Sequence, residues 1–112
     1  MLSMTAAGTV GNDSELKFTA NGDPILNFSV ACRTGYDKQK GEAETTWVRC
    51  VMFGKRGETA AAQLVKGTKV TVMGEGKLRN YTTSDGRAGS SLEMNVTGYA
   101  LQGGKPTVDP FD

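Results

Sequence analysis

Residues 46–56, with the sequence TWVRCVMFGKR, constrain the fold more than any other segment of the chain. Apolar side chains alternate here with a second set, in which two aromatic rings flank a guanidinium, and this period of two predicts a β-strand. The first set, which suits a protein core, is Val48, Cys50 and Met52. The second set, on the opposite side of the strand, is Trp47, Arg49, Val51 and Phe53. The segment therefore predicts a strand with two unlike faces.

The second face of this strand has features that suit unpaired nucleic-acid bases. Such bases stack on flat rings and need cations near their phosphates, and Lys55 and Arg56 follow at the end of the strand. The alternative is a strand buried on both sides, in which Trp47 only packs. The strand by itself leaves both interpretations open.

The composition limits both the size of the core and the kind of partner. The chain has 112 residues with 38% hydrophobic content, 15 glycines and 3 prolines, which predicts one small domain of short strands joined by many turns. Its 13 basic and 12 acidic residues leave a net charge of +1, so the sequence has no strongly basic footprint. Any binding to nucleic acid must then depend on local cations and on stacking.

Several function classes are disfavoured by residues that the sequence lacks. It contains no histidine, so neither a Ser-His nor a Cys-His nucleophile pair can form, and we expect no enzymatic activity. Cys32 and Cys50 share strand parity with apolar neighbours and lack CxxC spacing, so we expect buried free thiols and neither a metal nor a cofactor. Without an apolar run of membrane-span length or a signal segment, we expect a cytoplasmic protein with no membrane partner.

The remaining patterns predict an order of elements. Strands are expected up to residue 10, over residues 24–33, 46–53 and 70–79, and from residue 92, with a small hairpin closed at residues 21–22. A charged loop is expected over residues 37–44, a loop tip at Asp85-Gly86, and one helix over residues 58–65.

The order β-β-β-α-β-β predicts an all-β fold, a five-stranded Greek-key OB-fold barrel with one short helix between strands three and four. SH3-like barrels also have five strands, and the helix position favours the OB-fold. We place the domain at residues 1–101 and a flexible tail at residues 102–112.

Four segments resemble bacterial-type single-stranded DNA-binding proteins, and the resemblance covers about residues 8–101. The strongest match is to that family's third strand. The segments are residues 11–18, 27–31, 46–55 and 67–79. The resemblance implies an OB-fold that binds single-stranded DNA without strong sequence preference in replication, recombination and repair. It also implies a homo-oligomer, with a tetramer favoured over a dimer, while a cellular, plasmid or phage source stays open.

The resemblance further implies four stacking side chains. Trp47 and Phe53 occupy two of the family's DNA-stacking positions in the third strand. Tyr81 and Tyr36 stand where the family usually has tryptophans, the first in the loop between strands four and five. Tyrosine in place of tryptophan, and a shorter loop, would weaken binding or shrink the site without changing its mechanism. The family often has histidine where this chain has Val48, which bears on subunit contacts.

Basic side chains at strand ends and in the two long loops are the candidates for phosphate contacts. Arg49 and Arg79 rank first, because each is close in sequence to a candidate stacking ring. For any one of the others, a solvated surface charge is the alternative. The complete set is Arg33, Lys38, Lys40, Arg49, Lys55, Arg56, Lys77, Arg79 and Arg87.

The last residues form a second candidate site. Asp109, Pro110, Phe111 and Asp112 place an apolar ring between acids after a glycine-rich segment. In the family, an acidic tip ending in Pro-Phe docks replication and repair proteins. This ending has fewer acids and one residue after its phenylalanine, and an inert end is the alternative.

Two other functions remain open at the level of sequence. A primosome-type accessory OB-fold protein would bind single strands but mainly bridge replication proteins. An OB module could instead serve protein interaction only. Tight DNA binding with fluorescence quenching would exclude the second, and a functional tail would disfavour the first.

Overall fold

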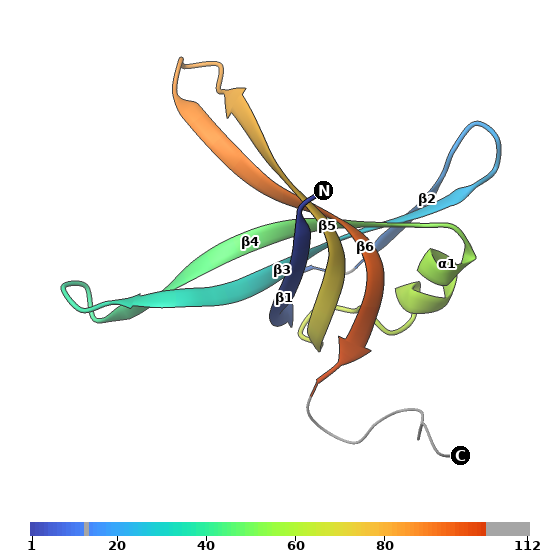
Figure 1. The fold of residues 1–112 in the computed structure, drawn as a ribbon, viewed down its shortest axis with the longest axis horizontal. Helices are drawn as coiled ribbons and strands as arrows, with labels where there is room; N and C mark the ends of the chain where they lie inside the picture. Colours follow the sequence, from blue (N-terminus) through green and yellow to red (C-terminus); the bar gives the residue numbers. More distant parts are fainter. Residues whose placement is uncertain (13, 103–112) are drawn as a thin grey trace.

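The computed structural model describes residues 1–12 and 14–102, and within them the chain forms strands and one short helix (Figure 1). The elements are β1 (Ser3–Val10), β2 (Glu15–Phe18), β3 (Pro24–Asp37), β4 (Glu42–Phe53), α1 (Lys55–Ala61), β5 (Lys69–Thr82) and β6 (Ala88–Leu101). No helix among the described residues has the length and apolar character needed to cross a membrane.

Five of the strands close into a barrel. They follow the order β1-β5-β6-β4-β3, and β1 returns to pair with β3 through Thr9↔Ala31 and Val10↔Val30. The β4–β6 pair is parallel and the other neighbours are antiparallel. Strand β2 lies outside this ring as the short arm of a hairpin with β3. The predicted five-stranded barrel, with its helix between the third and fourth barrel strands, is confirmed.

The core includes the three side chains of β4 that the sequence assigned to it, Val48, Cys50 and Met52. Alternate residues of β3 and β4 point inward, and α1 adds Ala60, with Leu64 following it, at one end of the barrel. Apolar burial of this kind is the main driving force for folding. The buried side chains of β3 and β4 are Leu26, Phe28, Val30, Cys32, Val48, Cys50 and Met52.

Two hairpins extend beyond the barrel, and they correct the predicted loops. In Figure 1 the β3–β4 hairpin and the β5–β6 hairpin project in different directions from the ring. The loop expected over residues 37–44 is wrong, because β3 runs to Asp37 and pairs there with Glu42 across a short turn. Tyr36 therefore lies on a strand, opposite Ala43, and Tyr81 lies on β5 rather than in a loop.

The helix also differs from its prediction, since it spans residues 55–61 and not 58–65. The amide of Gly54 donates to the Pro24 carbonyl at 2.9 Å, and the amide of Gly57 donates to the Gly54 carbonyl at 2.9 Å. The chain consequently begins its first helical turn as soon as β4 ends. Lys55 and Arg56 belong to this turn and not to the strand.

Candidate nucleic-acid interface

The exposed side of β4 belongs to a face that four adjacent strands share. Arg49 on β4 pairs with Ser29 on β3 and with Glu93 on β6, and Glu93 pairs with Lys77 on β5. Paired residues of a sheet point to the same side, so these four side chains form one row across the barrel surface. We call this side of β3, β4, β6 and β5 the outer face.

Two aromatic rings of β4 stand on the outer face. Trp47 is 52% exposed and Phe53 is 55% exposed, while Val48 and Cys50 between them are buried. The strand is therefore not buried on both sides, and that alternative is wrong. A large aromatic side chain that stays half exposed keeps ring surface available for stacking.

Trp47 is held in place by a close approach to Gly11. A Cβ atom built on Gly11 would lie 2.1 Å from Cζ3 and 2.5 Å from Cη2 of the indole. The six-membered part of the ring thus occupies the space that any other residue at position 11 would fill. Gly11 is itself tied to the barrel, since its amide donates to the Ser29 carbonyl at 2.9 Å.

Tyr81 is seated in the same manner on β6. It pairs directly with Gly89, and a Cβ atom on Gly89 would lie 2.6 Å from both Cε2 and Cζ of the phenol ring. Aromatic rings that cover a cross-strand glycine are a known device for stabilising sheet edges. Here the ring remains exposed on its other side.

A groove of about 780 Å³ brings the two seated rings together with two arginines. Trp47 and Arg49 from β4 lie on one side of it, and Arg79 and Tyr81 from β5 lie on the other. The hydroxyl groups of threonine and serine side chains add hydrogen-bonding groups. The remaining lining residues are Thr45, Thr46, Leu78, Ser90, Ser91 and Leu92. Within the described part of the chain, no carboxylate lines this groove.

A second depression, of about 710 Å³, adjoins the groove and shares Arg49 with it. It surrounds Phe53 and contains Lys77, but unlike the groove it also contains carboxylates. Its acidic and amide side chains are Glu15, Glu75, Glu93, Asn12, Asn27 and Asn95. The outer face therefore combines a cationic part near Trp47 with a part of mixed charge near Phe53.

Glu93 was not identified from the sequence, and it makes an ion pair within this face. One of its carboxylate oxygens, Oε2, lies 3.8 Å from Nη1 of Arg79. The signal that could have found it is the Asp85-Gly86 tip, because a hairpin symmetric about Asp85 pairs Lys77 with Glu93. That Arg49 also neighbours Glu93 could not be found in this way, because it needs the register of the parallel β4–β6 pair, which no composition or motif supplies.

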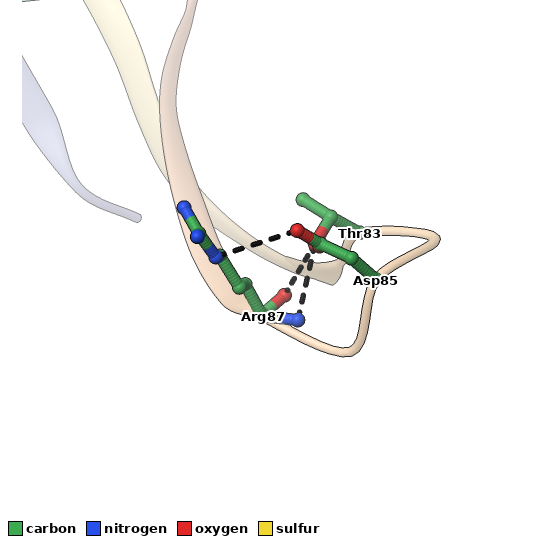
Figure 2. Close-up of polar contacts among 3 residues, drawn as sticks. All are labelled: Thr83, Asp85 and Arg87. Atoms are coloured by element: carbon green, nitrogen blue, oxygen red, sulfur yellow. Dashed lines mark hydrogen bonds and ion pairs between the residues drawn. The ribbon is translucent and has the colours of Figure 1, made fainter.

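Arg87 lies at the tip of the β5–β6 hairpin and takes part in the turn (Figure 2). Its Nε lies 3.3 Å from Oδ2 of Asp85, and its backbone amide donates to Oγ1 of Thr83 at 3.1 Å. The Thr83 hydroxyl also donates to Asp85, and this hydrogen bond is the main reason why the pKa of that carboxyl is lowered. The guanidinium thus has a partner within its own turn.

The other predicted basic residues lie at separate places. Lys38 and Lys40 lie in the turn between β3 and β4, where Tyr36 stands 56% exposed beside them. Arg33 is on β3, opposite Thr45. The groove thus unites four of the predicted side chains, and the second depression adds two. The four are Trp47, Arg49, Arg79 and Tyr81, and the two are Phe53 and Lys77.

Some predicted residues fall outside this arrangement. Lys55 and Arg56 begin α1 and line neither the groove nor the second depression. The tail residues Asp109, Pro110, Phe111 and Asp112 lie outside the described residues, so their predicted role stays a prediction.

The thiols lie beneath the face rather than on it. Cys32 and Cys50 are buried and free. Burial raises the pKa of the Cys50 thiol to about 12, and the nearby Cys32 contributes in the same direction. Burial also raises the pKa of Cys32. Over residues 1–12 and 14–102, no three His, Cys, Asp or Glu side chains are grouped as a metal ion would require.

Comparison with known proteins identifies relatives over nearly the whole described chain. The model of the single-strand binding protein family matches residues 1–102. The single-stranded DNA-binding protein of Paenarthrobacter aurescens is 36% identical over 98 residues, which cover 83% of this chain and 57% of that protein. That of Halalkalibacterium halodurans is 35% identical over 112 residues, covering 93% of this chain and 66% of that protein. The chain thus spans less than two thirds of the length of these relatives.

Two solved structures share the fold. The small single-stranded DNA-binding protein from Streptomyces coelicolor superposes with a TM-score of 0.75 at 20% identity, over 90% of this chain and 94% of that chain. The Plasmodium falciparum SSB complex with ssDNA gives a TM-score of 0.69 at 22% identity, over 92% of this chain and 96% of that chain.

Proposed function

The chain belongs to the single-strand binding protein family, and on this premise we propose that it binds single-stranded DNA without strong sequence preference. The observation that carries the proposal is the groove, where the Trp47 and Tyr81 rings stand with Arg49 and Arg79. Rings offer stacking surfaces to any base, and guanidinium groups pair with phosphates. Neither kind of contact requires a particular sequence.

The geometry supports a mechanism based on stacking. A strand passing along β4 would stack bases on Trp47, Phe53 and Tyr81, at about 1–3 kcal/mol for each stacked base. Arg49 and Arg79 would hold phosphates between them, and the groove hydroxyls would bond to the backbone or to base edges. Bases in a duplex are already stacked on one another, so they cannot reach these rings. The protein would therefore prefer single strands to duplex.

Family membership supports the wider biological role that we propose. The chain would protect single strands and block their reannealing during replication, recombination and repair, and it would act by binding rather than catalysis. It would work in the cytoplasm as a homo-oligomer, with a tetramer favoured over a dimer. Residues 1–101 would form the binding domain, and residues 102–112 a tail whose tip docks replication and repair proteins.

The test of DNA binding is a titration with oligothymidine, followed by tryptophan fluorescence. Trp47 is the only tryptophan, so its emission reports on the groove directly. We expect strong quenching by oligothymidine and a weak response to a duplex of the same length. A chain that leaves oligothymidine unbound, by fluorescence and by mobility shift, would instead be a module for protein interaction only.

A further inference from the structure

We propose that Glu93 is an intramolecular competitor of phosphate on the outer face, and that it sets the affinity and salt dependence of DNA binding. The inference rests on the proposed function. It concerns a residue that would repel the charged DNA backbone rather than bind it. Three observations carry it: the place of Glu93 in the sheet, its ion pair, and its partial burial.

The sheet register places Glu93 among three cations. Strand β6 lies between β4 and β5, and Glu93 pairs with Arg49 on one side and with Lys77 on the other. Arg79 lies diagonally from it on β5, within 3.8 Å. In an antiparallel pair such as β5–β6, directly opposed side chains have Cβ atoms about 4.5–5.5 Å apart. The carboxylate thus lies in the middle of the cations that would receive phosphates.

Glu93 is less exposed than the arginine it contacts. Its side chain is 30% exposed, whereas that of Arg79 is 64% exposed. A partly buried charge is screened by salt less than a fully exposed one. By formal charge, Arg49, Lys77 and Arg79 sum to +3, and with Glu93 these four residues sum to +2. Without DNA, the carboxylate relieves the mutual repulsion of these cations.

A phosphate that approaches Arg79 must displace this carboxylate or remain beside it. Displacement breaks an ion pair, and proximity places two like charges within several ångströms, so both outcomes oppose binding. The opposing effect applies to the charged backbone and not to the bases. Removing the charge of Glu93 should therefore strengthen binding to a charged strand and leave stacking unchanged.

The experiment compares Glu93→Gln with the wild type, with Glu93→Asp and with Glu58→Gln. The last variant removes the same charge from α1, away from the outer face. Each protein is titrated with oligothymidine over several salt concentrations, and with an oligothymidine whose backbone is made of uncharged methylphosphonates. Thermal melting verifies that each variant is folded.

For Glu93→Gln we expect oligothymidine affinity to rise about three- to tenfold at low salt, an effect of the size that one nearby charge produces. The log–log salt slope should become more negative by about 0.7, the value for one further phosphate neutralised on a single strand. The gain should disappear with the methylphosphonate strand. Glu93→Asp, which keeps the charge, and Glu58→Gln should both keep the wild-type slope.

Three results would overturn the inference. They are an unchanged or lower affinity in Glu93→Gln, an equal gain on the methylphosphonate strand, and an equal gain in Glu58→Gln. A wild-type protein that does not bind oligothymidine would refute the proposed function instead. The two failures can therefore be told apart.

Discussion

Two glycines control how the stacking rings are presented. Gly11 and Gly89 leave room for Trp47 and Tyr81, and a single methyl group at either position would overlap a ring. Each ring is thus fixed on one side by backbone and free on the other. A pre-positioned ring loses less conformational entropy when a base stacks on it, so under the proposed function we expect the glycines to contribute to affinity without touching DNA.

We expect Gly11→Ala to weaken oligothymidine binding by moving the indole. The loss should approach that of Trp47→Ala, which we place at about 1–3 kcal/mol, the value of one stacked base. Fluorescence titration measures the affinity, and the emission maximum of the free protein reports the displaced ring. Gly98→Ala is the matched control, because its Cβ would lie 3.4 Å from the nearest atom, Cγ of Met73. Unchanged affinity in Trp47→Ala would remove this residue from the site.

The buried thiol of Cys50 makes stability depend on alkaline pH. Its pKa is about 12 in the folded chain against an ordinary value of 9.0, so the folded state retains a proton that the unfolded state releases. Stability from this group is complete below pH 9 and is lost as the pH rises towards 12, by on the order of 2 kcal/mol at pH 10.5. Urea midpoints at pH 8 and pH 10.5 measure the loss. Cys50→Ala should be less stable at pH 8 but lose less between the two pH values.

At the scale of elements, alternation in the sequence predicted the strands wherever one face is buried. The pattern of Leu26, Phe28 and Val30 in β3 is an example, and all three side chains are buried. The outer half of the β3–β4 hairpin was missed because both of its faces meet solvent, so no apolar period marks it. The helix was displaced because its start depends on where β4 leaves the barrel, which is a tertiary constraint.

The groove was only partly predictable, for a related reason. Trp47, Arg49, Arg79 and Tyr81 were identified from residue type and from resemblance, and the structure places all four in one groove. Glu93 was missed because its importance comes from the register of three strands. A one-residue shift in pairing would move it to the other face, and nothing local in the sequence reports the register of the parallel β4–β6 pair.

In the β5–β6 hairpin, a double-mutant cycle tests whether Gly89 acts by leaving room for the Tyr81 ring. Gly89→Ala should displace the Tyr81 ring and weaken oligothymidine binding by up to about 1–3 kcal/mol, the value of one stacked base. In a Tyr81→Ala background the same change should have little further effect, because the effects of substitutions at residues in contact are not additive. Additive losses, measured by titration of all four proteins, would mean that Gly89 acts through something other than the ring.

At the scale of the whole molecule, the barrel and the last residues should act independently. Among residues 1–12 and 14–102, the buried core side chains lie between Ala6 and Val96. We therefore expect a chain without residues 109–112 to keep its melting temperature. DNA affinity should stay equal or rise slightly, because an acidic segment competes weakly with phosphates for the same cations.

If the tip docks a partner, Phe111 is its anchor. A pull-down from a replicating host extract that recovers the same proteins with Phe111→Ala would leave the barrel as the only functional part.

The low net charge of the whole chain predicts a weak salt dependence for the proposed DNA binding. With a net charge of +1, stacking on the outer face should supply an unusually large share of the affinity. Since each phosphate neutralised on a single strand contributes about −0.7, we expect a shallow log–log slope on the order of −2 to −4. Arg49→Ala and Arg79→Ala should each make it shallower, as measured by titration over several salt concentrations. Arg87→Ala is the contrasting variant, because its guanidinium pairs with Asp85 at the hairpin tip, and it should change the slope less. A slope that neither groove arginine alters would show that phosphates follow another path across the barrel, away from the rings of Trp47 and Tyr81.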